Sequence, residues 1–148
     1  MDNEEVAPSK LELFGPGEWI DEPDYLEFEY KGVRCEVNRN RSMGNLCGYV
    51  TVPVSHPWFG QHYSEIECDA HGGLTFGLMD GDRFVIGFDC AHWLDIVPQV
   101  ERINRSNETR RLFPPVEPFI PTYKNIAFVR EEIECIVNQM LEVIHEPR

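Results

Sequence analysis

The C-terminal end of the chain constrains the fold most, because its apolar residues recur with the period of a helix. In "YKNIAFVREEIECIVNQMLEVIHE", residues 123–146, the apolar positions spaced three or four apart are Ile126, Val129, Ile133, Ile136, Met140 and Ile144. Glutamates lie on the opposite side, so the pattern predicts an amphipathic helix of about six turns. We expect Thr122, directly after a proline, to cap its N-terminus. Such a helix must bury its apolar face against another layer of structure.

Upstream stretches with the pattern of β-strands supply that layer. "YLEFEYKGVRCEVNR", residues 25–39, alternates apolar and charged residues around a Lys-Gly pair, which predicts a hairpin. "CGYVTVPV", residues 47–54, predicts a strand that Pro53 ends. The runs "GLTFGL" and "RFVIGFD" flank "MDGD", and Asp-Gly between two apolar runs is typical of a hairpin turn. The predicted fold is therefore α+β: an antiparallel β-sheet of hairpins packed against a long C-terminal amphipathic helix.

The segments between these elements are less regular. We expect "SHPWFGQHYSE", residues 55–65, to be a loop or a single helical turn. "WLDIVPQVERINRSNETRR", residues 93–111, predicts a short helix broken by Pro98 and then a loop. The proline-rich "LFPPVEPFIPT", residues 112–122, predicts an extended connector.

The length of 148 residues is that of one domain. We place an acidic N-terminal arm with several prolines at residues 1–23 and a single α+β domain at residues 24–148. The chain has no run of 18 apolar residues, and its acidic start does not resemble a secretory signal. We therefore expect a cytoplasmic protein with no membrane partner.

The formal net charge of −13 disfavours nonspecific binding to nucleic acid, which depends on Lys and Arg. Residues 1–30 hold ten Asp and Glu residues and a single lysine. Two basic stretches remain, "KGVRCEVNRNR" at residues 31–41 and "RINRSNETRR" at residues 102–111. Either they meet a phosphate-bearing ligand, or, as the simpler interpretation, they pair with the protein's own carboxylates.

The cysteines do not form a recognisable metal or redox motif. They number five, at positions 35, 47, 68, 90 and 135, and no C-x-x-C pair occurs. This pattern disfavours a zinc ribbon or a thioredoxin-like site. In a reducing cytosol we expect most of them to be small buried hydrophobic residues.

The hairpin between Asp69 and His92 carries the densest group of polar side chains. A two-residue turn at Asp80-Gly81 places His71 opposite Cys90 and Asp69 opposite His92. A one-residue slip, as in a turn with a bulge, places His71 opposite Asp89 instead. Both registers bring His71 beside "FDCAH", residues 88–92.

This end of the hairpin is the candidate site for a ligand. Ligand pockets combine aromatic walls with a few polar groups, and aromatic residues adjoin these polar ones in sequence. Glycines permit close approach of a ligand, although a pair of them is also common at a bulge. The predicted ligand-binding residues are His56, His62, His71, Gly72, Gly73, Thr75, Asp89, Cys90, His92 and Asp95, with help from arginines near residues 102–111.

Two catalytic alternatives use the same residues. Cys90 with His71 or His92 would form a nucleophilic pair, oriented by Asp89 or Asp95. Histidines with a carboxylate would bind zinc. Because the chain contains neither H-E-x-x-H nor a phosphate-binding P-loop, we expect no metal and no cofactor.

Several motifs together resemble a family of small uncharacterised proteins of tailed phages and prophages. They are "CGYV" at residues 47–50, His56-Pro57, "HGGLT" at residues 71–75 and "GFDCAH" at residues 87–92. The resemblance covers residues 32–139. It departs at Trp93-Leu94-Asp95, where the family often has Ala-Gly-Asp, so the shape of a pocket there would differ. Because small accessory phage proteins often antagonise host defence, the resemblance implies a counter-defence role in the host-cell cytoplasm.

We therefore expect a phage accessory protein that binds and sequesters a small nucleotide-type ligand without turning it over. The first alternative is a Cys/His-dependent or metal-dependent hydrolase. The second is an acidic antagonist of a protein partner, or a nucleic-acid mimic. Besides the ligand, a host defence protein and a second copy of the chain are the partners to consider.

Overall fold

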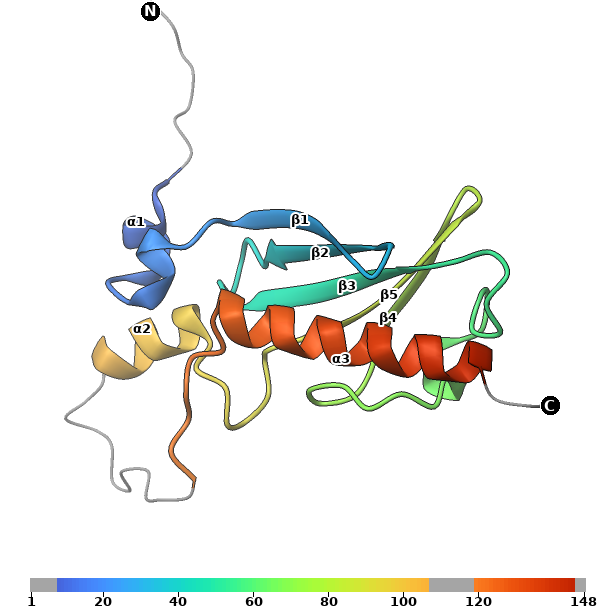
Figure 1. Ribbon diagram of the computed structural model, residues 1–148. Helices are drawn as coiled ribbons and strands as arrows, with labels where there is room; N and C mark the ends of the chain where they lie inside the picture. Colours follow the sequence, from blue (N-terminus) through green and yellow to red (C-terminus); the bar gives the residue numbers. More distant parts are fainter. Residues whose placement is uncertain (1–7, 107–118, 146–148) are drawn as a thin grey trace, which may run out of the picture.

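The computed structural model of the protein describes residues 8–106 and 119–145, and it confirms the predicted α+β fold. Five antiparallel strands form one sheet in the order β1-β2-β3-β5-β4. The long helix α3 (Ile126–His145) lies along one face of this sheet (Figure 1). The strands are β1 (Tyr25–Tyr30), β2 (Val33–Arg39), β3 (Leu46–Val52), β4 (Phe76–Asp80) and β5 (Arg83–Asp89).

Buried side chains alternate with more exposed ones along β2 and β3, so the sheet has a core face, covered by α3, and an open face. On α3 the predicted apolar residues Val129, Ile133, Ile136 and Met140 are buried. They pack with residues of the central strands in one hydrophobic core. Gly48 of β3 lies under the helix, where an added Cβ would stand 2.6 Å from the Phe88 ring and 3.1 Å from Ile133. A glycine here therefore allows the close packing of helix on sheet.

The helix α3 starts later than its sequence pattern predicts. Its first residue is Ile126, and the side chain of Asn125 accepts a hydrogen bond from the Phe128 N–H at 2.9 Å, as an N-cap does. The prediction of Thr122 as the cap is wrong, because Thr122 forms an isolated parallel bridge with Asp95 instead. That bridge ties the chain before α3 to the segment after β5.

The proline at residue 98 begins a helix rather than breaking one. Helix α2 spans Pro98–Ser106, which corrects the prediction of a short helix interrupted at Pro98. Proline suits the first turn, where its missing N–H would have no partner within the helix. The predicted helical turn within residues 55–65 is the 3₁₀ helix η2 (Tyr63–Glu65). Of the predicted connector, residues 112–118 lie outside the described residues.

The described part of the N-terminal segment packs on the domain. It contains α1 (Lys10–Phe14) and the 3₁₀ helix η1 (Glu18–Asp21), and α1 lies beside α2 (Figure 1). Phe14 and Trp19 are buried, and the Trp19 ring meets Tyr123 edge-on at 5.3 Å. Residues 8–23 therefore share side-chain packing with the rest of the fold.

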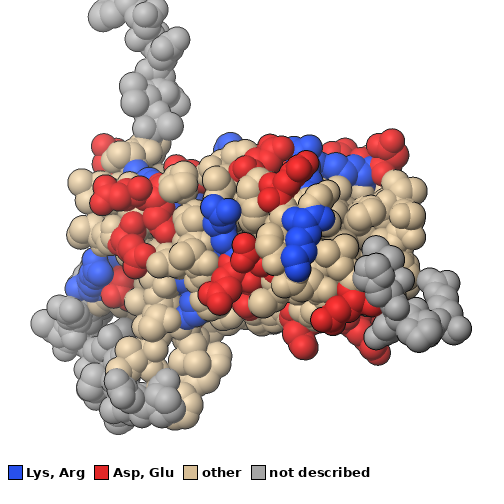
Figure 2. Space-filling view, in the orientation of Figure 1, with Lys and Arg blue, Asp and Glu red and all other residues tan. Residues whose placement is uncertain are grey.

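The surface is charged, and the open face of the sheet carries polar side chains. Figure 2 shows several groups of acidic side chains on this face, with fewer basic ones between them. On the open face, Glu27, Glu36 and Tyr49 form one cross-strand row. Within the described ranges, no helix has both the length and the apolar character needed to cross a membrane.

Candidate functional site

Asp95 is the centre of a cluster of side chains that come from three separate segments. Its carboxylate has no exposed surface and contacts His71 Nε2 at 2.9 Å, His92 Nδ1 at 3.1 Å and Lys124 Nζ at 3.1 Å. We call these four residues the Asp95 cluster. A buried carboxylate must be paired or hydrogen-bonded, and these partners satisfy that requirement.

Short turns and the bridge between residues 95 and 122 bring the three segments together. A turn closed by the Gly73 N–H carries His71. The Asp95 N–H donates to the His92 carbonyl, so these two residues lie on one turn after β5. The bridge from Asp95 to Thr122 then places the following lysine near the carboxylate. His92 and Asp95 are thus brought together by a local turn, whereas His71 and Lys124 join them only through the fold.

The surroundings of Asp95 hold its side chain in the charged form. Burial by itself raises the pKa of this carboxyl group. Hydrogen bonds from His71, from the His92 backbone N–H and from Lys124 outweigh that effect and lower the pKa. The cluster therefore contains a buried negative charge that faces one ammonium group and two imidazoles.

Gly72 is required for the position of the His92 ring. An added Cβ at this residue would lie 2.1 Å from the Cε1 and Nε2 atoms of His92, far inside van der Waals contact. Its φ of +69° also belongs to the left-handed region that favours glycine. The turn at residues 70–73 is therefore shaped around the imidazole.

Replacing Gly72 with alanine should destabilise the protein by about 1–3 kcal/mol and displace the His92 ring. The matched control is Gly73→Ala, because Gly73 has a similar φ of +83° but no atom within 4 Å of an added Cβ. The control carries the backbone strain without the clash. Urea unfolding and histidine side-chain NMR measure both effects, and equal losses with an unmoved His92 signal would contradict this account of Gly72.

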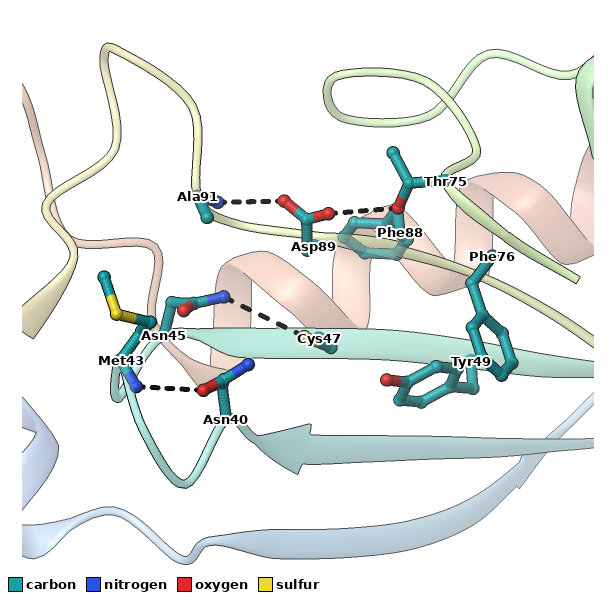
Figure 3. Close-up of a pocket in the computed structure, with 10 residues that line it drawn as sticks. All are labelled: Asn40, Met43, Asn45, Cys47, Tyr49, Thr75, Phe76, Phe88, Asp89 and Ala91. Atoms are coloured by element: carbon teal, nitrogen blue, oxygen red, sulfur yellow. Dashed lines mark hydrogen bonds between the residues drawn. The ribbon is translucent and has the colours of Figure 1, made fainter.

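A pocket of about 410 Å³ lies next to the cluster, at the edge of the open sheet face. Figure 3 shows residues from the β2–β3 turn, from β3 and from the β4–β5 pair around it. Its lining includes Asn40, Asn45, Cys47, Tyr49, Phe76 and Asp89. We call this space the Asp89 pocket.

Asp89 connects the pocket to the Asp95 cluster. Its Oδ1 accepts a hydrogen bond from the Ala91 N–H at 3.1 Å, and its Oδ2 accepts one from the Thr75 hydroxyl at 3.0 Å (Figure 3). The same Oδ1 lies 3.7 Å from His92 Nε2. One carboxylate therefore lines the pocket and faces the outer nitrogen of a cluster histidine.

Tyr49 and Phe76 form the aromatic wall of the pocket. Their rings meet edge-on, with centroids 5.3 Å apart. Both residues pair with Gly87 across the sheet, and an added Cβ at Gly87 would lie 2.5 Å from the Tyr49 ring. The missing side chain at this position therefore makes room for the Tyr49 ring.

The predicted site residues lie in the Asp95 cluster, in the Asp89 pocket, or outside both. His71, Gly72, His92 and Asp95 meet at the Asp95 cluster, Gly73 closes its turn, and Thr75 and Asp89 line the pocket. Cys90 is buried in the core, and burial raises the pKa of its thiol well above the usual range. A thiolate nucleophile at this position is therefore strongly disfavoured.

The structure places His56 and His62 away from the cluster. His56 is buried, and its Nε2 lies 2.7 Å from the Met140 carbonyl. Since the His71 ring contacts Phe128, twelve residues earlier on α3, the two contacts lie about 18 Å apart along the helix. His62 is exposed, and its Nδ1 accepts the Ser64 N–H at the start of η2.

Both predicted hairpin registers are wrong. Asp80 pairs with Arg83, so the turn residues are Gly81 and Asp82, and Gly81 has the positive φ that such a turn needs. Strand β4 also begins only at Phe76, so His71 lies in a turn before the sheet. The predicted proximity of His71 to residues 88–92 is confirmed, because the His71 and His92 rings lie 5.2 Å apart.

The basic stretches pair mainly with the protein itself, as the simpler interpretation predicts. Arg34 contacts two glutamates, and Arg39 is buried beside Glu22 and Asp24. Arg105 donates to the Pro16 carbonyl, which ties α2 to the N-terminal segment. Residues 110 and 111 lie outside the described part of the chain.

Some site residues do not stand out in the sequence. Lys124 is missed because it precedes a helix and joins the cluster only through the bridge at residue 122. Asn40 and Asn45 read as ordinary turn residues. Tyr49 carries a detectable signal, because it alternates with the core positions of β3 and so belongs to the open face.

Comparisons with known proteins identify no relative. No family model, no curated protein and no solved structure matches the chain.

Proposed function

We propose that the protein binds a nucleoside-type ligand in the Asp89 pocket and holds it without chemical change. The observation that carries this proposal is the combination of an aromatic wall, two asparagine amides and a carboxylate around one pocket. Its volume of about 410 Å³ lies within the range of small-molecule sites.

Each of these groups matches one part of a nucleoside. The Tyr49–Phe76 wall offers apolar surface to a base, and the stacking of bases on aromatic rings tolerates any base. The two asparagine amides offer one kind of polar atom each to the edge of a base. Asn40 offers its Nδ2 group, since its Oδ1 already accepts the Ser42 and Met43 N–H groups. Asn45 is largely buried and its Nδ2 donates to the Leu46 carbonyl, so its Oδ1 is the atom left as an acceptor. A carboxylate such as Asp89 accepts hydrogen bonds from ribose hydroxyls.

The charges favour the nucleoside portion of a ligand over its phosphate. Asp89 brings a negative charge to the pocket, and among the described residues that line it there is no lysine or arginine. A phosphate placed there would be repelled and would lack a cationic partner. We therefore refine the predicted nucleotide-type ligand to one whose base and ribose enter the pocket.

Cys90 supports binding without turnover. Cys90, next to the pocket residue Asp89, is buried in the core and burial raises its pKa. The thiol that lines the pocket is Cys47, and burial raises its pKa as well. Neither thiol is therefore set up as a thiolate nucleophile. Ligand recovered from denatured protein should therefore have its original mass. Recovery of a cleaved product would favour the hydrolase alternative.

A second hollow of about 1030 Å³ lies near the N-terminal segment but fits a ligand less well. Of its four charged lining residues, Lys10, Asp24 and Arg39 are joined in ion pairs, and the fourth is Arg41. A ligand there would have to break these contacts. The Asp89 pocket has no such network of paired charges across it.

Isothermal titration with adenosine, guanosine, cytidine and uridine tests the proposal. We expect at least one nucleoside to bind, and its 5′-monophosphate to bind more weakly. Tyr49→Leu should weaken binding about tenfold, since stacking of a base on an aromatic ring contributes about 1–3 kcal/mol. Asp89→Asn should reduce the preference for the nucleoside over the monophosphate, because it removes the negative charge.

Tyr25→Leu is the matched control. Tyr25 is a tyrosine on the same open face, but it lies on the far edge strand β1 and is not part of the pocket. Its replacement should leave nucleoside affinity unchanged. Absence of binding to all four nucleosides, or equal effects of the two leucine variants, would contradict the proposal.

The counter-defence role extends this proposal and is supported by the resemblance to phage proteins alone. If sequestration is the activity, bacteria with a nucleotide-signalling defence should become sensitive to phage when they express the protein. Tyr49→Leu should lose that effect while Tyr25→Leu keeps it. An effect that survives in Tyr49→Leu would favour the acidic-antagonist alternative.

A further inference from the structure

We infer that the Asp95 cluster is a binding site for a divalent transition-metal ion such as zinc, with His71, His92 and Asp95 as its ligands. This inference goes beyond the proposed function, and none of its three ligand residues lines the Asp89 pocket. The sequence shows no metal-binding motif because His71 lies 24 residues before Asp95 and reaches the His92–Asp95 turn only through the fold. Histidine nitrogens and a carboxylate oxygen are common ligands of zinc in proteins.

The distances suit an ion with little rearrangement. One ligand atom from each of the three residues lies within 4.8 Å of the others. His71 Nε2 and His92 Nδ1 lie 2.9 and 3.1 Å from the carboxylate oxygens. Ligand atoms around tetrahedral zinc lie about 3.4 Å apart, given metal–ligand bonds near 2.1 Å. Small side-chain movements would therefore create the coordination geometry.

The exposure of the three side chains gives an ion a way in. Asp95 has no exposed side-chain surface, while His71 and His92 are 20% and 32% exposed. The carboxylate thus forms the floor of the site and the imidazoles form its rim. Three protein ligands that are open on one side leave the fourth coordination position of a tetrahedral ion for water.

Surrounding groups hold both imidazoles in place. The His71 ring packs edge-on against Phe128 at 5.0 Å, and Gly72 fits closely against the His92 ring. When His92 binds through Nδ1, its Nε2 faces the Asp89 carboxylate at 3.7 Å. Histidine ligands commonly direct their second nitrogen to a carboxylate in this way, which fixes the ring and strengthens the ligand.

Lys124 is the group that a metal ion must compete with. Its ammonium lies 3.1 Å from Asp95 Oδ1 and would repel a cation bound to the same carboxylate. The same ammonium also donates to the carbonyls of Leu94 and Thr122, so it keeps partners if it moves away from Asp95. Removal of this charge should strengthen metal binding.

Isothermal titration of the full chain with Zn²⁺, after treatment with a chelator, tests the inference. We expect one equivalent to bind, and both His71→Ala and His92→Ala to weaken binding about 100-fold or more, because loss of even an outer-sphere partner costs 10–100-fold. Lys124→Met should bind Zn²⁺ more tightly than the wild type. Two controls, His62→Ala and Cys135→Ser, remove an exposed histidine and an exposed thiol outside the cluster and should leave binding unchanged.

A second measurement needs no variant and so does not depend on the stability of the mutants. Zn²⁺ should shift the imidazole NMR signals of His71 and His92 in the wild-type protein and leave those of His56 and His62 in place. Co²⁺ should give the visible spectrum of nitrogen and oxygen ligands without a thiolate charge-transfer band. Absence of stoichiometric binding, shifts centred on His62, or a thiolate band would each overturn the inference.

Discussion

Replacing Asp95 with alanine should lower the free energy of unfolding by about 3–5 kcal/mol, because removal of one partner leaves a buried charge without compensation. The charge left behind is that of Lys124, whose side chain is 14% exposed. The replacement also removes the acceptor that orients both cluster histidines. Urea unfolding of chelator-treated protein measures the loss.

The double variant Asp95→Ala/Lys124→Met separates the buried charge from simple loss of packing. Because it removes both charges, it should be more stable than Asp95→Ala alone. Asp80→Ala, at an exposed strand end, is the control and should change stability by less than about 0.5 kcal/mol. A loss of less than 1 kcal/mol in Asp95→Ala, or no recovery in the double variant, would contradict this account of the cluster.

Replacing Arg39 with methionine should cost about 3–5 kcal/mol, for a related reason. The Arg39 side chain is 3% exposed and contacts Asp24, Glu22 and the Tyr123 hydroxyl. Glu22 in turn accepts a hydrogen bond from the Ile126 N–H at the start of α3. Arg39 therefore joins the N-terminal segment, the sheet and the helix.

Arg34→Met is the matched control for this prediction. Arg34 lies on the same strand and also contacts two carboxylates, but its side chain is 44% exposed. Exposed ion pairs contribute about 0–1 kcal/mol, so its replacement should have little effect on thermal or urea unfolding. Equal losses in the two variants would show that burial does not determine the contribution of Arg39.

The fold could be predicted from local patterns because each pattern has a clear physical period. The apolar spacing after residue 126 identifies α3, and the Lys31-Gly32 turn is found where the alternation predicts it. The exact ends of the helices and strands were harder to predict from the sequence. The start of α3 depends on which of several polar residues caps the helix, and the structure has Asn125 there. The register of β4 with β5 depends on which residues form the turn between them. Contacts with the rest of the fold select between these local alternatives.

The site was predicted only in part, for the same reason. His71 and His92 approach each other because a hairpin reverses the chain, which the sequence reveals. Their shared partner is Asp95. A bridge to Thr122 holds Asp95 in place, and no local sequence pattern predicts that bridge. His56 is also a histidine, but it is buried away from the cluster and its ring contacts the Met140 carbonyl. Residue type alone could not separate these roles.

A two-dimensional ¹⁵N–¹H NMR titration of the full chain with adenosine, guanosine, cytidine and uridine tests the ligand-binding proposal most directly. We expect at least one nucleoside to shift the amide signals of Cys47, Tyr49, Phe76 and Asp89, which belong to the Asp89 pocket. The edge strand β1 should remain unaffected. No shift with any nucleoside, or shifts that are confined to residues outside the pocket, would contradict the proposal.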